Sequence, residues 1–323
     1  MALQSSGAIK LSEINTELGR SSTATISLDS AESGGYDTIN TNSPSYPSNA
    51  RPASISEWYS YNHSAAAPVV NTHYWLGDGV NDTMRFTGNS YDLFAANTSQ
   101  DMSFCGWYRI DETSAQVQHL MSASTSTVDG NNQIFIQYHG SLNRLMFRYR
   151  HNGAFHQVQK SLHDNFSETG VSSSGWTSTN RGNTNGNGFV FLAFTYDASN
   201  RTASSGMKIY WNDEPMNATA SSSDVGSPAA WNARSFAIGD LVSTSPNNAN
   251  VFKGGIDQVS VYKKVLTQAE ITSLYNSGVP RSCSANGVTT NLVAEYKLDN
   301  NTDNSSGTFM DLQNIGGGTF ISY

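Results

Sequence analysis

Charged residues are scarce in this chain of 323 residues, since Asp, Glu, Lys and Arg together make up 14%. The 18 basic residues are outnumbered by 26 acidic ones, which gives a net charge of −8 at pH 7. Phosphate backbones are bound by clustered Lys and Arg, so the composition argues against nucleic acid as a partner. Ser, Thr, Asn and Gly fill the loops instead, which suits either a particle or extracellular surface or a low-charge proteome.

Long apolar runs are also missing. No stretch approaches the roughly 20 apolar residues that cross a bilayer, so we expect no membrane insertion. The first residues, MALQSSGAIKL, lack the apolar core of a signal peptide. A surface protein without an export signal must leave its cell by another route, and release by lysis as part of a virus particle is one such route.

Cysteine is rare, with Cys105 and Cys283 as the two in the chain. Cys105 lies in the strand-like DMSFCGWYRI, so a buried thiol is favoured over a disulfide. Two cysteines so far apart do not make a metal motif.

Residues 1–65 differ from the rest of the chain. They contain one short helical pattern, SEINTELG, with Ser12 as a plausible N-cap and Gly19 as the stop. A Ser-, Gly- and Pro-rich stretch and the motif SISEWYSY follow. Because so small a segment is not expected to bury a core of its own, we expect an extended arm that is held by the main domain or by a neighbouring subunit. HSAAAPVV, 63–70, is expected to be the hinge.

From Thr72 onward the pattern becomes β. Short segments with alternating aromatic or β-branched residues are bounded by Gly, Asn, Asp or Pro. Eight or more such strands without intervening long helices predict an all-β sandwich of two sheets. Residues 164–188 form a polar insertion whose length is typical of functional or disordered loops.

One segment, FKGGIDQVSVYKKVLTQAEITSLYNSG, combines a strand with a short helix. Thr267 and Glu270 have the spacing of a capping box, and Leu266 and Ile271 have that of a hydrophobic staple. Gly278 lies where a left-handed C-terminal cap is expected.

These segments carry a family resemblance. YWLGDGVNDTMRF, MSFCGWYRI, GMKIYWNDEP, FAIGD and the strand–helix segment resemble, in this order, laminin-G-like and concanavalin-A-like jelly-roll domains. The resemblance implies a jelly roll over 66–280, closed by one short C-terminal helix that covers the sandwich through Ile271 and Leu274. LVAEYKLDNNTDNSSGTF resembles an edge-strand segment of such proteins, and 281–323 is expected to be a strand-containing extension packed on the jelly roll.

The N-terminal segment has a second resemblance. SGAIKLSEINTELG, followed by PASISEWYSYN, is similar to the N-terminal segments of tail, fibre and other structural proteins of tailed bacteriophages. The resemblance implies a virion-attachment role for 1–65. The residues expected to carry it are Leu11, Ile14, Leu18, Ile55, Trp58 and Tyr59.

The spacing of Asp and Glu residues in the sequence does not match that of a glycosidase. The fold class includes β-glucanases with an E-x-D-x-x-E strand, which is absent here, and glycosidases need two carboxyl groups that face one bond. The adjacent pairs Asp111–Glu112 and Asp213–Glu214 are expected to lie in turns or to point to opposite faces of a strand. We therefore expect a protein that is not an enzyme.

Calcium is the one cofactor that the resemblance suggests. Laminin-G-like domains often hold it with Asp side chains and backbone carbonyls, and Asp78, Asp82 and Asp240 offer oxygen ligands of the kind that Ca²⁺ prefers. The same residues also simply make turns. Asp257 matches a family position and is interpreted as a structural hydrogen-bonding residue.

Glycan binding needs an exposed aromatic ring beside Asn and Asp. Trp176 and Trp231 are the aromatics that strand periodicity explains least, so they are the predicted ligand-binding residues. Trp107 and Trp211 alternate within strands and are expected in the core.

The sequence therefore predicts a non-enzymatic structural protein on a tailed-phage virion surface, assembled in the host cytoplasm. Residues 1–65 would bind other virion proteins, and the jelly roll would bind host surface glycan from a tail or head fibre. A homo-oligomer is expected, with a trimer favoured because phage fibres favour trimers, whereas decoration proteins vary. The alternatives are a capsid decoration protein that reinforces the head and, outside the virion, a secreted carbohydrate-binding module.

Overall fold

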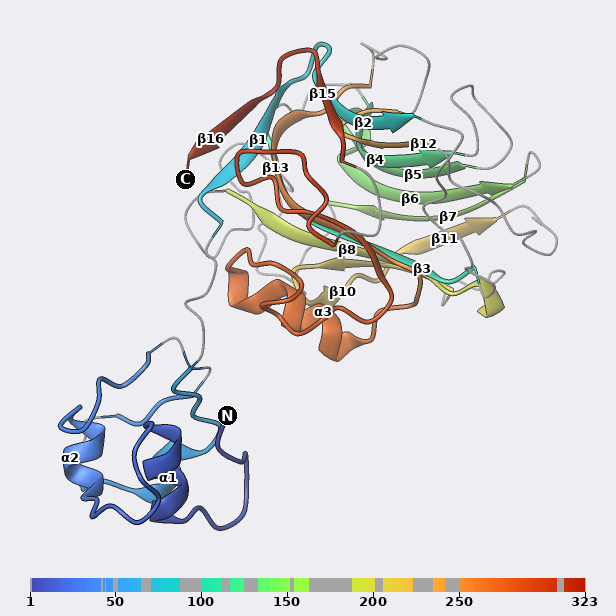
Figure 1. The fold of residues 1–323 in the computed structure, drawn as a ribbon. Coiled ribbons are helices and arrows are strands. Elements are labelled where there is room, and N and C mark those ends of the chain that lie inside the picture. The colour runs from blue at the N-terminus through green and yellow to red at the C-terminus, as the bar shows by residue number, and fades with distance from the viewer. Residues whose placement is uncertain are drawn as a thin grey trace. The chain divides into compact units, whose positions relative to one another are not determined.

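The structure is a computed structural model, and the chain divides into two compact units, Met1–Val69 and Val70–Tyr323 (Figure 1). The structure describes residues 2–41, 43, 45–48, 52–64, 71–87, 100–111, 117–124, 133–151, 154–162, 188–200, 206–222, 235–241, 250–306 and 311–322. Most of the predicted hinge, 65–70, lies outside these residues.

The first unit is built from short helices around a small core. Its elements are α1 (Leu11–Glu17), α2 (Leu28–Glu32) and the 3₁₀ helix η1 (Ile55–Trp58). The helix predicted at SEINTELG is present, but it begins at Leu11, before the expected cap Ser12, and Glu13 accepts a hydrogen bond from the Lys10 amide (2.7 Å). Gly19 follows the helix with φ +69°, as a C-terminal stop requires.

We expected residues 1–65 to form an extended arm without a core, but they belong to a compact unit with a core of its own. Its buried apolar side chains form one cluster that is separate from the cores of the second unit. Two hydrogen bonds join distant segments around this cluster: the Trp58 indole donates to Glu32 (3.2 Å), and the His63 amide donates to Glu17 (2.8 Å). Two aromatic rings and two carboxylates that satisfy buried donors allow a short segment to form a core. The core residues are Ile9, Ile14, Leu18, Ala31, Trp58 and Tyr61.

The second unit is a sandwich of antiparallel sheets, and in the described residues two sheets of eight strands are found (Figure 1). The all-β jelly-roll prediction is confirmed. Sheet A has the order β10 (Glu214–Pro215), β9 (Met207–Trp211), β8 (Val190–Tyr196), β3 (Met102–Ile110), β13 (Lys253–Tyr262), β1 (His73–Asp78) and β16 (Thr319–Ser322), and β14 (Leu292–Tyr296) also pairs with β13. Sheet B has the order β11 (Thr219–Ser222), β7 (Ala154–Ser161), β6 (Arg144–His151), β5 (Gln133–His139), β4 (Val117–Ser124), β12 (Ser235–Ile238), β2 (Thr83–Thr87) and β15 (Gln313–Ile315).

The main core lies between the two sheets, and a second core lies on the outer side of sheet A. That second core includes Ile271 and Leu274 of α3 (Gln268–Tyr275), together with Cys105 and Trp107 of β3. The Trp107 ring stacks on Tyr275 at 5.9 Å between centroids. The covering helix is thus confirmed, and both faces of β3, β8 and β13 are buried.

The N-terminal end of α3 is as predicted, whereas its C-terminal end differs from the prediction. Thr267 and Glu270 form the predicted capping box. The left-handed cap, however, is Asn276 (φ +47°), and the turn continues through Ser277 (φ +52°) and Gly278 (φ +90°). Asn tolerates this conformation because its short side chain bonds the local backbone, here to the Val279 carbonyl (3.0 Å).

The last segment, 281–323, belongs to the second unit. It supplies β14 and β16 to sheet A and β15 to sheet B. The buried Asn71 amide donates to the Asp257 carboxylate and to the Lys297 carbonyl (2.7 Å). Asp257 is fully buried and bonds the Gln258 amide (2.8 Å), so its structural role is confirmed.

Both cysteines are buried free thiols, as expected for Cys105. Burial raises the pKa of the Cys105 thiol well above its ordinary value, which makes it a poor nucleophile. None of the helices in the described residues has the length and apolar character needed to cross a membrane.

Candidate functional site

The two sheets differ in what covers their outer faces. Sheet A carries α3 and the second core on its outer side, whereas β5 of sheet B alternates between buried and half-buried side chains. Ile134, Ile136 and Tyr138 point into the main core. Because successive side chains of a strand point to opposite faces, Phe135 and Gln137 lie on the outer face of sheet B.

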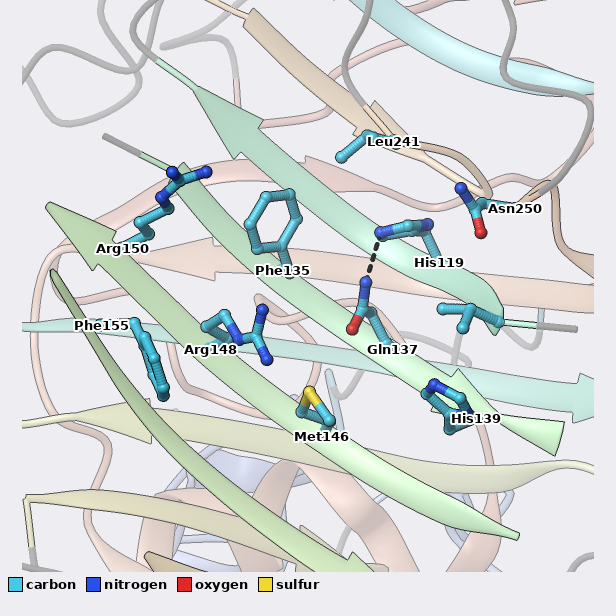
Figure 2. A pocket seen from close by; sticks show the side chains of 11 residues that line it. His119, Phe135, Gln137, His139, Met146, Arg148, Arg150, Phe155, Leu241 and Asn250 are labelled. Carbon is cyan, nitrogen blue, oxygen red and sulfur yellow. Dashed lines mark hydrogen bonds between the residues drawn. The ribbon is translucent and has the colours of Figure 1, made fainter. Parts of the chain in front are cut away.

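This outer face holds a hollow of about 500 Å³. Its size falls within the usual range for small-molecule sites, about 300–1,000 Å³. Figure 2 shows the lining side chains rising from β4, β5, β6 and β7, with two residues from the segments beside β12 and β13 at one edge. They are Val117, His119, Phe135, Gln137, His139, Met146, Arg148, Arg150, Phe155, Leu241 and Asn250.

Arg148, one of the lining cations, is held by contacts from two neighbouring side chains. Its Nε donates to Gln157 Oε1 (2.8 Å), and its guanidinium lies 5.0 Å from the centre of the Phe155 ring. The Gln157 amide in turn donates to Gln159 Oε1 (3.2 Å), which also accepts from Arg144 Nη1 (2.9 Å). This ladder across β6 and β7 fixes the side chain in one orientation, and it leaves both Nη groups without a hydrogen-bond partner among the described residues.

His119 and Gln137 form the opposite wall of the hollow (Figure 2). Burial lowers the pKa of His119 to about 4, although the Asn250 backbone acts in the raising direction. The ring is therefore neutral at pH 7, and its Nε2 accepts from the Gln137 amide at 2.6 Å. An amide and a neutral imidazole are groups that bind hydroxyls through hydrogen bonds.

The buried neutral His119 predicts a pH-dependent stability. The unfolded chain takes up this proton near pH 6.5, and the folded chain does so only near 4, so stability is lost as the pH falls through that window. The difference corresponds to about 3 kcal/mol. We expect His119→Gln to remove this loss, measured as the change in urea midpoint between pH 7.5 and pH 4.5. An equal change in wild type and variant would contradict the assignment, because all other titrating groups are shared.

The hollow combines apolar rings with polar groups. Phe135 and Phe155 offer ring surface, while Gln137 and Asn250 offer amides. A sugar presents C–H groups on one side of its ring and hydroxyls at its edge, so this mixture suits a glycan. Glycosidases cleave with two carboxyl groups. Among the described lining residues there is no Asp or Glu.

The predicted ligand-binding tryptophans are not part of this description. Trp176 and Trp231 lie outside the described residues, as does most of the polar insertion 164–188, so both stay predictions. Trp107 and Trp211 are 3% and 0% exposed, which confirms that they belong to the core.

The residues of the hollow were missed by the sequence reasoning, which searched for isolated tryptophans. The available signal was the alternation in NQIFIQYHG and RLMFRYRHNG, where every second residue is polar, cationic or a solitary ring, apart from Met146. Two neighbouring strands with such outward residues predict one polar face. The contributions of Leu241 and Asn250 could not be predicted, because they depend on how distant segments pack.

The predicted metal ligands were tested against their surroundings. Asp78 Oδ1 accepts from the amides of Val80 (2.7 Å) and Asn81 (3.4 Å), and Asp82 Oδ2 accepts from the Asp78 amide (2.9 Å). Burial raises the pKa of Asp82. Asp240 is fully buried, and its Oδ1 accepts from the following amide (2.6 Å). These contacts are those of loop-shaping residues.

Asp78 and Asp82 also line a hollow of about 400 Å³ with Asp111 and Lys253. Asp111 is already paired with Arg109 at 2.9 and 2.8 Å. In the part of the chain that the structure describes, no three His, Cys, Asp or Glu residues form a group that could hold a metal ion. Calcium binding by Asp78, Asp82 and Asp240 therefore stays a prediction.

The residues predicted for virion attachment lie within the first unit. Ile14, Leu18 and Trp58 are in its core, where they cannot contact a partner while the unit is folded. Leu11 is 42% exposed, and Ile55 and Tyr59 are partly buried against the core. The motif residues thus hold the unit together, and Leu11 is the one that presents a large exposed apolar surface.

Three solved structures illustrate what the chain is similar to. A SAP-like pentraxin from Limulus polyphemus is 10% identical, with 78% of this chain and 95% of that chain covered and a TM-score of 0.46. A putative carbohydrate binding protein from Bacteroides ovatus is 15% identical, with 80% and 61% covered and a TM-score of 0.47. The CBM40 of the Ruminococcus gnavus IT-sialidase, bound to α2,3 sialyllactose, is 14% identical, with 62% and 100% covered and a TM-score of 0.37.

These likenesses concern the fold alone, and the chain spans less than two thirds of the Bacteroides ovatus protein. No curated protein matches the sequence. A laminin G-type family model, described as the concanavalin A-like lectin/glucanases superfamily, matches residues 78–272. This match covers more than half of the chain and includes most strands of both sheets as well as the start of α3. The chain therefore belongs to the concanavalin A-like lectin/glucanases superfamily.

Proposed function

We propose that this protein binds glycans in the hollow on the outer face of sheet B, without cleaving them. The observation that carries the proposal is the composition of that hollow: two phenylalanine rings, amides and a neutral imidazole surround about 500 Å³ on the sheet face that α3 leaves uncovered. The lining contains the ring surface and hydrogen-bonding groups that sugars need. The described lining lacks the carboxyl pair that hydrolysis needs.

The test is a glycan array probed with the full chain, its Phe135→Ala variant and its Tyr46→Ala variant. Phe135 lines the hollow, whereas Tyr46 is an aromatic residue of the first unit that is 50% exposed. We expect wild type and Tyr46→Ala to bind the same glycans and Phe135→Ala to lose at least tenfold in affinity. Equal binding by all three proteins would exclude the hollow, and no binding by wild type would contradict the proposal.

For the biological setting, we propose a tailed-phage virion protein that is attached through residues 1–65 and displays the jelly roll for host adhesion. The proposal rests on the similarity of SGAIKLSEINTELG and PASISEWYSYN to phage structural proteins. Its structural support is that these motifs supply the core of a separate small unit. A decoration protein on the head and a secreted carbohydrate-binding module are the competing proposals.

Quantitative mass spectrometry of intact particles separates these settings. A few to a few tens of copies, with antibody against residues 1–69 labelling the tail, would support adhesion. Hundreds of copies over the head would support decoration. Absence from particles would contradict both virion proposals and favour the secreted module.

A further inference from the structure

The hollow on sheet B is locally basic in a protein whose net charge is −8. Arg148 and Arg150 both line it, and Arg144 lies on the same face of β6, four residues before Arg148. Among the described residues, no carboxylate lines the hollow. Cationic side chains that line a concave site attract ligands of the opposite sign.

Arg109 provides a comparison, because its guanidinium is hydrogen-bonded to a carboxylate. Arg109 donates to both oxygens of Asp111 and, through Nη1, to the Tyr74 hydroxyl at 2.9 Å. Burial lowers the pKa of Arg109, but the bonds to Asp111 and Tyr74 outweigh this effect and leave its pKa raised. For Arg148, burial and the neighbouring Arg150 both lower the pKa. Arg148 is thus held by Gln157 and Phe155, but unlike Arg109 it has no carboxylate partner among the described residues.

An anion is the group that completes such a site. A guanidinium presents paired N–H donors in a planar fork that matches carboxylate and other oxyanions with two parallel hydrogen bonds. The Nε of Arg148 is held by Gln157, and the Phe155 ring faces the guanidinium. The two Nη groups remain for a ligand. A prepositioned fork loses less side-chain entropy on binding than a free one.

We propose that the hollow is selective for acidic sugars, with the carboxylate or sulfate group of the sugar bound by the Nη groups of Arg148. Arg150 adds positive charge beside it, and Phe135, Gln137 and Asn250 contact the rest of the sugar. This inference rests on the proposed glycan-binding function and adds the class of ligand to it.

Calorimetric titration of the full chain with four probes tests the inference. The probes are lactose, sialylated lactose, sulfated lactose and a galacturonate oligosaccharide. We expect at least one acidic probe to bind at least tenfold more tightly than lactose. A preference for the sialyl and galacturonate probes identifies a carboxylate as the ligand group, and a preference for sulfated lactose identifies a sulfate.

Variants connect the selectivity to one residue. Arg148→Gln is expected to reduce affinity for the preferred acidic probe at least tenfold more than it reduces affinity for lactose, so that the preference for the acidic probe is lost. Arg148→Lys, which keeps the charge without the fork, is expected to recover only part of the loss. Lys208→Gln removes the same charge from an exposed position on sheet A, and is expected to change nothing.

Each outcome separates the two proposals. Equal wild-type affinity for lactose and the acidic probes would overturn the inference and leave glycan binding intact, whereas no binding of any probe would contradict glycan binding itself. Loss of acidic binding in Lys208→Gln as well as in Arg148→Gln would show general charge attraction and overturn the inference. An unchanged melting temperature of Arg148→Gln establishes that its loss of affinity is not loss of fold.

Discussion

Trp58→Ala is expected to unfold residues 1–69 while the jelly roll stays folded. The Trp58 side chain is fully buried, its ring meets Tyr61 edge to face at 5.2 Å, and its indole N–H satisfies Glu32. Truncating a buried aromatic costs about 3–5 kcal/mol, which is as much as a core of this size supplies in total. The two units have separate cores, so the loss is expected to stay within the first.

Hydrogen exchange of the full chain, read by mass spectrometry, measures this effect. Peptides from residues 2–64 should exchange freely in Trp58→Ala, and peptides from β3, β8 and β13 should keep their protection. Leu11→Ala is the matched control, because Leu11 belongs to the same unit but is 42% exposed, and surface changes usually stay within about 0.5 kcal/mol. Unchanged exchange of residues 2–64 in Trp58→Ala would contradict the core that we describe.

Gly254→Ala is expected to have the largest effect in the jelly roll. Gly254 pairs with Ile110 at the end of the ladder between β13 and β3, two inner strands of sheet A, and has a φ of +144°. A Cβ atom there would lie 1.9 Å from the Arg109 carbonyl oxygen, which is backbone. Neither strand can move aside without breaking the β13–β3 ladder, so we expect a loss of more than about 4 kcal/mol, a value reserved for severe steric conflicts.

Gly317→Ala separates this steric conflict from the cost of the backbone angle. Gly317 also has a positive φ, +111°, but no atom lies within 4 Å of a Cβ placed on it. We expect Gly317→Ala to lower the free energy of unfolding by only the cost of its backbone conformation, about 1–3 kcal/mol. Urea unfolding followed by tryptophan fluorescence gives both values. Equal midpoints for the two variants would show that the close approach of the strands is not what requires glycine at 254.

The jelly roll was predictable because its local signals agree with its packing. The capping box of Thr267 and Glu270 marked α3, and the alternating segments marked most of the strands. Sheet A also shows why periodicity alone was insufficient. In MSFCGWYRI nearly every residue is buried, since one face meets sheet B and the other meets α3, and a two-sided burial pattern does not reveal which side is which.

The first unit and the candidate site were less accessible from the sequence. The core around Trp58 depends on Glu17 and Glu32, polar residues whose buried hydrogen bonds have no signature in a hydrophobic pattern. The hollow depends on Arg148, which is indistinguishable in sequence from the other arginines. That no described carboxylate pairs with it, in contrast to Arg109, becomes visible only when the strands are placed side by side.

Hydrogen exchange of the full chain, with and without its preferred glycan, tests glycan binding on the outer face of sheet B. We expect added protection in peptides that cover β5 (Gln133–His139) and β6 (Arg144–His151), and none in those that cover α3. Protection confined to other segments would show that the glycan binds elsewhere, however tightly it binds.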